Sequence, residues 1–190
     1  MRNIFRALIF LSPLCLYSLE GAIEGRGGYF YFANSTAREI YHQGAPDVEL
    51  ESFLLVSRYF TPWLNINYVW KEGQSEALSD RTDLKMGLFS FGSKILFPYL
   101  NSTVKGYIGV GLCGAYVHIT DHSAYLPNKT IRWGGGVVGK SGMLIDIKWG
   151  IFLDLFFDYY YLPIKTRSSV SENFINLGGF RTGLGIGAHF

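Results

Sequence analysis

The sequence has few cysteines and no long apolar run. Its two cysteines are Cys15 and Cys113, and they cannot form an internal framework if Cys15 is removed with a leader peptide. Beyond the first 22 residues the longest uncharged stretch is 106–120, whose fifteen residues include four glycines, whereas a membrane-spanning helix needs about 20 apolar residues. The pattern excludes a helical membrane protein. Cys113 is either a small apolar strand residue or the site of an intermolecular disulfide.

The sequence also lacks a marked excess of positive or negative charge. The formal net charge is +2, and the 17 Lys and Arg and 15 Asp and Glu residues are spread singly along the chain. Proteins that track phosphates carry clustered basic residues, so nucleic acid is not an expected partner. His118 and His189 have no second histidine or carboxylate at ligand spacing. We therefore expect neither a metal site nor a cofactor.

Glycine and aromatic residues, in contrast, are abundant. The 190 residues include 23 Gly, 13 Tyr and 15 Phe. Disordered chains have few aromatic and β-branched residues, so this chain folds, and its length fits one domain.

The N-terminal segment has the pattern of a secretory signal peptide. Arg2 and Arg6 precede thirteen uncharged, mostly apolar residues, 7–19. The run is too short for a helical anchor, and Pro13 interrupts it. We predict a cleaved signal peptide over 1–22 and a single domain over 23–190.

Most of the mature chain alternates in hydropathy with a period of two, which predicts antiparallel strands. The clearest segment is 151–163, where one face is wholly apolar or aromatic. Phe89 and Phe91 break the phase set by residues 84–88, which suggests a bulge near 90–92. The expected strands are 27–32, 53–60, 63–71, 83–88, 104–120, 133–147, 151–163 and 180–190. Three short connections and four long ones, 34–48, 72–82, 121–130 and 166–173, join these eight strands, and the long ones would face outside.

Periodicity alone does not say which face is inside. A soluble eight-stranded barrel would turn its bulky residues inward and its charges outward. We favour the inverse arrangement, in an outer-membrane barrel, because the leader indicates secretion and because glycines and charges of both signs alternate with large aromatics. An interior only eight strands wide is filled by side chains, so small and paired charged residues fit it. The expected interior charges are Arg26, Arg58, Lys71, Asp83, Lys85, Lys140, Asp154, Asp158 and Arg181.

The last strand ends on an aromatic residue, in the run Leu184-Gly-Ile-Gly-Ala-His-Phe190. This run resembles the assembly signal of Gram-negative outer-membrane barrels, with Phe180, Leu184, Ile186, Ala188 and Phe190 on one face. Together with 107–112 and 152–156 it resembles the small eight-stranded barrels that include OmpW-like, OmpX/Ail-like and opacity-type surface proteins. The resemblance implies an outer-membrane location in a Gram-negative-type bacterium. The partners it implies are membrane lipid, the barrel-assembly machinery and periplasmic chaperones.

Catalytic constellations are weak in this sequence. Asp121-His122-Ser123 is the nearest to a hydrolase set, but neighbours in sequence point in different directions and do not form a triad. Asp154 and Asp158 would lie about 13 Å apart along a strand, too far for a two-carboxylate mechanism. We therefore expect a structural or surface-interaction barrel without enzymatic activity, whose surface ligand the sequence does not identify. The alternatives are a narrow conduit or binding barrel for small apolar solutes and a lipid A-modifying enzyme.

Overall fold

The chain forms a closed β-barrel, described here from a computed structural model that covers residues 20–57, 59–74, 81–99, 103–122, 129–167 and 172–190. Eight antiparallel strands make the wall in the order β1-β10-β7-β6-β5-β4-β3-β2, so each pairs with the wall strands before and after it in the chain. The prediction of an all-β, eight-stranded, up-and-down barrel is confirmed. The wall strands are β1 (Glu20–Phe32), β2 (Gly44–Leu55), β3 (Thr61–Gln74), β4 (Arg81–Tyr99), β5 (Val104–Asp121), β6 (Lys129–Asp146), β7 (Ile151–Tyr161) and β10 (Gly179–His189).

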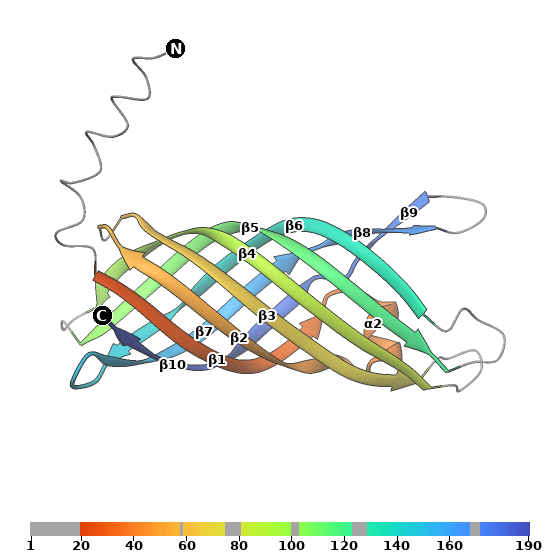
Figure 1. Cartoon of the computed structure of the whole chain (residues 1–190), viewed down its shortest axis with the longest axis horizontal. Coiled ribbons are helices and arrows are strands. Elements are labelled where there is room, and N and C mark those ends of the chain that lie inside the picture. The colour runs from red at the N-terminus through yellow and green to blue at the C-terminus, as the bar shows by residue number, and fades with distance from the viewer. Residues whose placement is uncertain (1–19, 58, 75–80, 100–102, 123–128, 168–171) are drawn as a thin grey trace, which may run out of the picture.

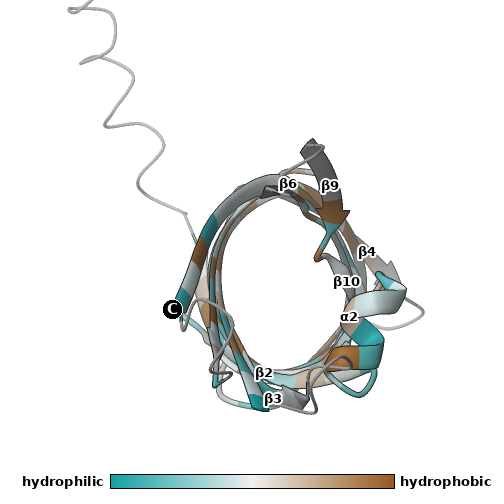
Figure 2. Ribbon diagram, turned by 90° about the vertical axis from the view of Figure 1, so that its right-hand side faces the viewer, coloured by the Kyte–Doolittle hydropathy of each residue, from teal (hydrophilic) through white to brown (hydrophobic). Residues whose placement is uncertain are grey.

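The two ends of the barrel differ in their connections. At one end, here called the turn end, β2, β4 and β6 end and β3, β5 and β7 begin, beside the C-terminus (Figure 1). At the other, the loop end, lie the helix α2 (Ser35–Ile40) and the small sheet of β8 (Pro163–Arg167) and β9 (Glu172–Asn176). Viewed along its axis, the wall is a closed ring with α2 at the rim (Figure 2). No helix in the described part of the chain is long and apolar enough to span a membrane.

The barrel closes where the first and last strands meet. β1 and β10 pair antiparallel from Ala22↔His189 to Phe32↔Gly179. Beyond this ladder, Gly21 and Phe190 exchange two backbone hydrogen bonds, of 2.9 and 2.8 Å. β1 thus begins at Glu20 and includes the last residues of the predicted leader, whose residues 1–19 lie outside the described part of the chain.

Three predicted strands differ clearly from the observed ones. The first was predicted over 27–32, but β1 begins at Glu20. The second strand was predicted over 53–60, but β2 begins at Gly44, so the connection before it is 33–43 rather than 34–48. The fourth strand was predicted over 83–88 with a bulge near 90–92, but β4 runs from Arg81 to Tyr99 and pairs without interruption with β3 over 81–94 and with β5 over 82–99. The bulge prediction is wrong because both faces of β4 carry apolar residues. Leu84, Met86 and Leu88 face inward while Phe89 and Phe91 face outward, so the alternation continues without a break. The hairpin of β8 and β9 was not predicted.

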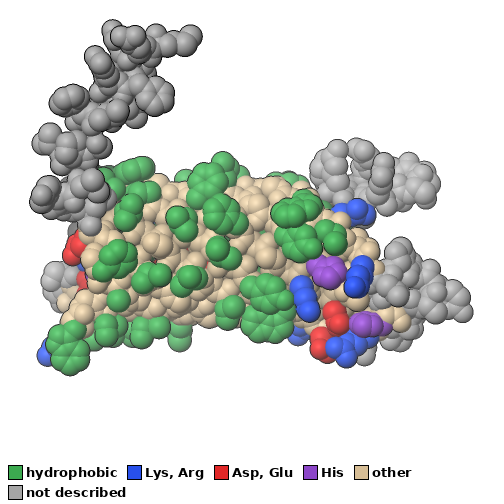
Figure 3. Space-filling model, viewed as in Figure 1, with side chains coloured by type: hydrophobic (Ala, Val, Ile, Leu, Met, Phe, Trp, Pro, Cys, Tyr) green, Lys and Arg blue, Asp and Glu red, His purple; other side chains and the backbone are tan. Residues whose placement is uncertain are grey.

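The outward face of the wall is an apolar surface. Val110, Leu184 and Ile66 are 67%, 65% and 60% exposed, and hydrophobic side chains are spread over the barrel between its ends (Figure 3). Aromatic side chains stand on the same surface, including Trp133 at 76% exposure. Among the described strand residues, the outward-facing charged side chains lie toward the loop end: Glu72, Arg81, Asp83, Lys85 and Lys129. Such a wall is stable in lipid and would be unfavourable in water.

Candidate functional site: the charged lumen and the pocket at its mouth

Buried charged side chains lie at the centre of the barrel, and we call this set the lumen cluster. Alternate residues of the strands point inward, so charged residues spaced two or four apart meet inside the barrel. Four cations and six carboxylates are buried among the described residues. The lumen cluster consists of Arg26, Lys94, Lys140, Arg181, Glu24, Asp47, Glu49, Glu51, Asp154 and Asp158.

Arg26 is the hub of the lumen cluster. Its guanidinium lies 2.7 Å from Glu24, 2.6 Å from Asp154 and 3.1 Å from Glu51. The same group donates to the hydroxyl of Tyr107 at 3.2 Å, and that hydroxyl donates to Asp154 at 3.1 Å. Arg26 therefore connects carboxylates of β1, β2 and β7 across the lumen.

The other three cations complete the cluster. Lys94 lies 2.9 Å from Glu51, and Lys140 lies 3.1 Å from Glu49. Arg181 pairs with Asp47, with Glu49 at 2.8 Å and with Asp158 at 3.3 Å. These contacts join β2 to β4, β6 and β10, and they join β10 to β7. Buried charges are tolerated when they are paired and hydrogen-bonded in this way.

Apolar layers enclose the lumen cluster on both sides. Toward the turn end, the ammonium of Lys94 lies 3.6 Å above the ring of Phe53, and that of Lys140 lies 4.7 Å above Trp63. Toward the loop end, most of the buried inward side chains are apolar: Phe30, Phe32, Val69, Leu84, Met86, Leu88, Ala115, Val117 and Val138. The lumen is filled by side chains in three layers, as expected of an eight-stranded barrel.

The structure places eight of the nine predicted interior charges, and these fall into three groups. Five lie in the lumen cluster: Arg26, Lys140, Asp154, Asp158 and Arg181. Lys71 is on the inward face near the loop end, half-buried, and forms no ion pair with a described carboxylate. Arg58 lies outside the described residues.

Asp83 and Lys85 were predicted to point inward, and this is wrong. In β4 the inward residues are Leu84, Met86 and Leu88, which are buried, whereas Lys85 is exposed on the outward face. Asp83 bonds outward groups, with Arg81 at 3.1 Å and His122 at 3.1 Å. From the sequence we expected the apolar residues of this strand to face lipid. Near the loop end, however, the lumen is mainly apolar and the outer surface of the rim is charged.

Half of the lumen cluster was missed from the sequence. Glu24, Asp47, Glu49, Glu51 and Lys94 are all buried inside. A signal was present, because the run Asp-Val-Glu-Leu-Glu-Ser at 47–52 alternates charged and apolar residues, as a strand with a charged inner face does.

The remaining polar candidates include His122, His189 and Cys113, whereas the side chains of Asp121 and Ser123 lie outside the described part of the chain. His122 bonds Asp83 of β4. His189 lies 3.4 Å from Asp146, and no group of three His, Cys, Asp or Glu side chains is arranged for a metal among the described residues. Cys113 is buried on the inward face, and it is a free thiol.

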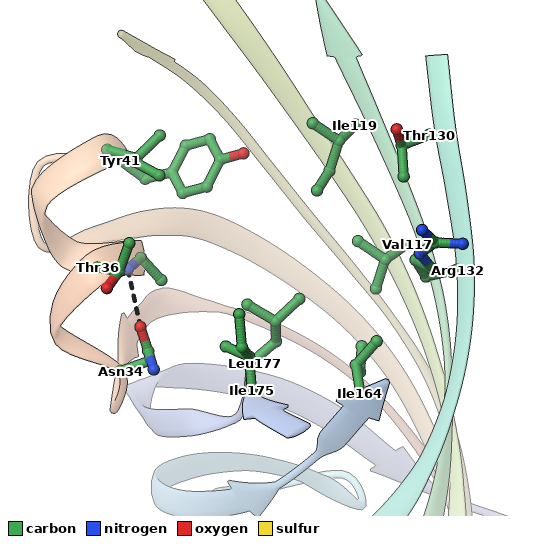
Figure 4. Close-up of a pocket in the computed structure, with 12 residues that line it drawn as sticks. Asn34, Thr36, Tyr41, Val117, Ile119, Thr130, Arg132, Ile164, Ile175 and Leu177 are labelled. Atoms are coloured by element: carbon green, nitrogen blue, oxygen red, sulfur yellow. Dashed lines mark hydrogen bonds between the residues drawn. The ribbon is translucent and has the colours of Figure 1, made fainter. Parts of the chain in front are cut away.

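A pocket of about 330 Å³ opens at the loop end, here called the mouth pocket (Figure 4). Its first wall is α2, which begins where the Asn34 side chain accepts a hydrogen bond from the Ala37 backbone at 3.1 Å. Two residues with left-handed backbone, His42 and Gln43, then return the chain to β2. The lining residues are Asn34, Thr36, Ala37, Ile40, Tyr41, Val117, Ile119, Thr130, Arg132, Ile164, Ile175 and Leu177.

Within the described part of the chain, one charged residue, Arg132, lines the mouth pocket. Arg132 of β6 lies next to Thr130 on the wall opposite α2 (Figure 4). It is half-buried, and it forms no ion pair with any carboxylate that the structure describes. Small-ligand sites are commonly apolar cavities with a few polar groups that fix orientation, and the mouth pocket has this composition.

The closed eight-stranded wall, its apolar outer surface and its charged lumen define an outer-membrane type of β-barrel. No family model and no curated protein sequence matches the chain. Solved structures of this fold do match it. OprG from Pseudomonas aeruginosa has a TM-score of 0.65 at 11% identity, covering 91% of this chain and 96% of its own.

Two further structures extend the comparison. Neisserial surface protein A has a TM-score of 0.63 at 12% identity, with 90% of this chain and 96% of that one covered. The attachment invasion locus protein Ail of Yersinia pestis, solved with the heparin analogue sucrose octasulfate, has a TM-score of 0.61 at 12% identity, with 91% and 99% covered. This chain therefore has the fold of the small eight-stranded outer-membrane barrels.

Proposed function

We propose that this protein resides in the outer membrane of a Gram-negative-type bacterium and acts as a non-catalytic surface barrel. The observation that carries the proposal is the distribution of outward-facing charge. The described wall is apolar between its ends, and its outward charges gather toward the loop end, where α2 and the β8–β9 hairpin also lie. An apolar wall fits the hydrocarbon of a bilayer, and a charged end fits the side that meets water.

The loop end is the contact surface in this proposal. Its connections are 33–43, 75–80, 122–128 and 162–178, which carry both elements outside the wall. Loops on a rigid scaffold are common sites of recognition because their sequence can vary without disturbing the fold. Because side chains fill the lumen, the wall acts as a scaffold in this proposal, and the loop end makes the contacts with other molecules.

Membrane location and loop exposure can be tested together. We expect the protein to fractionate with outer membranes and to migrate faster on a gel before boiling than after. An epitope inserted between His122 and Lys129 should bind antibody on intact cells, because this connection is at the loop end. The same epitope inserted between Lys148 and Gly150 at the turn end is the matched control and should stay hidden. Recovery in the soluble fraction, or the opposite exposure of the epitopes, would contradict the proposal.

Phe190 connects the fold to the proposed assembly partners, the barrel-assembly machinery and periplasmic chaperones. It is 74% exposed, and its backbone closes the β1–β10 seam through Gly21. Deleting Phe190 should reduce the assembled fraction in cells several-fold, as measured by the heat-shifted gel band. Refolding into detergent should be affected less, because only one residue pair of the seam is lost. Phe190→Tyr, which keeps an aromatic end, should assemble normally, and normal assembly of the deletion would count against this role.

The mouth pocket favours a second role, the binding of small apolar molecules. Its lining is mainly apolar and lies at the end that would face the outside. Passage through the lumen is not part of this role, because three layers of side chains fill the barrel below the pocket. A steady single-channel current from the refolded protein in a planar bilayer would overturn this restriction.

A further inference from the structure

We infer that the mouth pocket binds a small amphiphilic carboxylate, with its alkyl chain in the apolar part of the pocket and its carboxylate at Arg132. This inference deepens the second role proposed above and rests on it. Its basis is the pairing of an apolar cavity with one cation that has no described partner.

The apolar part of the pocket comes from three sides. Val117 and Ile119 of β5 form one side, Ala37 and Ile40 of α2 another, and the third comes from the segments around β8 and β9, with Ile164, Ile175 and Leu177. In Figure 4 the labelled side chains of Val117, Ile119, Ile164 and Leu177 point into the same space. Apolar cavities bind water poorly and take up apolar ligands. A volume of about 330 Å³ suits a short alkyl chain rather than a large molecule.

Arg132 differs from the cations deeper in the barrel. Arg26, Lys94, Lys140 and Arg181 each pair with carboxylates of the lumen cluster. Arg132 also has an inward-facing position, but it lines the pocket without forming an ion pair with a described residue. A guanidinium presents a planar fork of donors that matches a carboxylate. An incoming carboxylate would therefore supply the partner that the protein does not.

The rest of the lining sets the charge of the ligand. Among the described residues that line the pocket, Arg132 is the only charged one. One cation balances one negative charge, which favours a monoanion over a multiply charged phosphate. Thr130 on the same strand, and Asn34 and Thr36 opposite, provide neutral polar groups at the edge of the cavity. The arrangement suits a molecule with a single anionic head and an apolar tail.

Octanoate binding to the protein in lipid nanodiscs tests the inference. With ¹³C-labelled Ile, Leu and Val methyl groups, octanoate should give saturable chemical-shift changes at Val117, Ile119 and Ile164. The outward methyl groups of Ile66 and Val110 report simple partitioning of octanoate into the lipid, and their shifts should not saturate with the pocket signals. Equal, non-saturating shifts at both sets of methyl groups would overturn the inference and the second role together.

The variant Arg132→Gln tests the carboxylate site separately from the apolar pocket. Octanoate affinity should fall about tenfold, because a charge-assisted hydrogen bond is lost, while octan-1-ol affinity should stay unchanged. Lys85→Gln, which removes an exposed outward cation at the same end, is the matched control and should leave both affinities unchanged. Arg132→Lys keeps the charge and should retain part of the preference. If Arg132→Gln binds octanoate as tightly as the unmodified protein, the anion site is wrong and an apolar pocket remains.

Discussion

Replacing Arg26 by Met should lower the free energy of unfolding by about 3–5 kcal/mol, the cost of removing one partner from a buried ion pair. Arg26 supplies the shortest ion pairs of Glu24 and Asp154, at 2.7 and 2.6 Å, and both carboxylates are buried. Without the guanidinium these charges keep their desolvation cost and lose their nearest compensation. Urea unfolding in lipid vesicles, followed by tryptophan fluorescence, measures the change.

Two variants control for effects unrelated to the lumen cluster. Lys85→Met removes a cation from the exposed outward face and should change stability by less than about 0.5 kcal/mol. Arg26→Met combined with Asp154→Asn should recover part of the loss, because it removes one of the uncompensated charges. If Arg26→Met fails to fold while the double variant folds, the account holds. Equal stability of Arg26→Met and the unmodified protein would refute it.

Leu112→Arg should destabilise the barrel by about 2–4 kcal/mol in a bilayer, because it places a cation near the middle of the lipid-facing wall. Leu112 is 55% exposed and lies in the central part of β5, paired with Phe91 of β4 and Val137 of β6. Ile131→Arg is the matched substitution near the loop end and should cost only about 0–1 kcal/mol. Unfolding in vesicles measures both.

The contrast between these two positions separates a membrane wall from a soluble one. On a water-facing surface, Arg at either position would be tolerated, since surface substitutions usually change stability little. Equal and small effects of Leu112→Arg and Ile131→Arg would therefore argue against insertion of the wall into lipid.

The sequence predicted the architecture well because strand number depends on turns and periodicity, both of which are local. It predicted the inner and outer faces less well, because the lumen changes character along its axis. Where the lumen is charged, as at Asp154 and Asp158, polarity marks the inner face correctly. Where the lumen is apolar, as at Leu84 and Met86, the same rule assigns the residues to the wrong side.

The start of β2 was hidden for a different reason. The residues before Val48 are polar enough to suggest a loop, and the alternation at 47–52 is short. Its partners are distant in sequence, since Glu49 meets Lys140 and Arg181. Such contacts depend on closure of the barrel and cannot be inferred from a local pattern. The mouth pocket escaped prediction likewise, because it needs α2, β5, β6 and the β8–β9 region together.

The residues of the lumen cluster are unevenly distributed along the chain, and this affects how the barrel closes. The first hairpin, β1–β2, carries four of the six buried carboxylates and only one of the four buried cations. The compensating cations arrive later, with Lys94 on β4, Lys140 on β6 and Arg181 on β10. Arg181 lies on the strand that is synthesised last, so charge compensation is complete only when the full chain is present. A barrel that lacks the later strands would hold an excess of negative charge on β1 and β2, and this favours cooperative closure of the barrel.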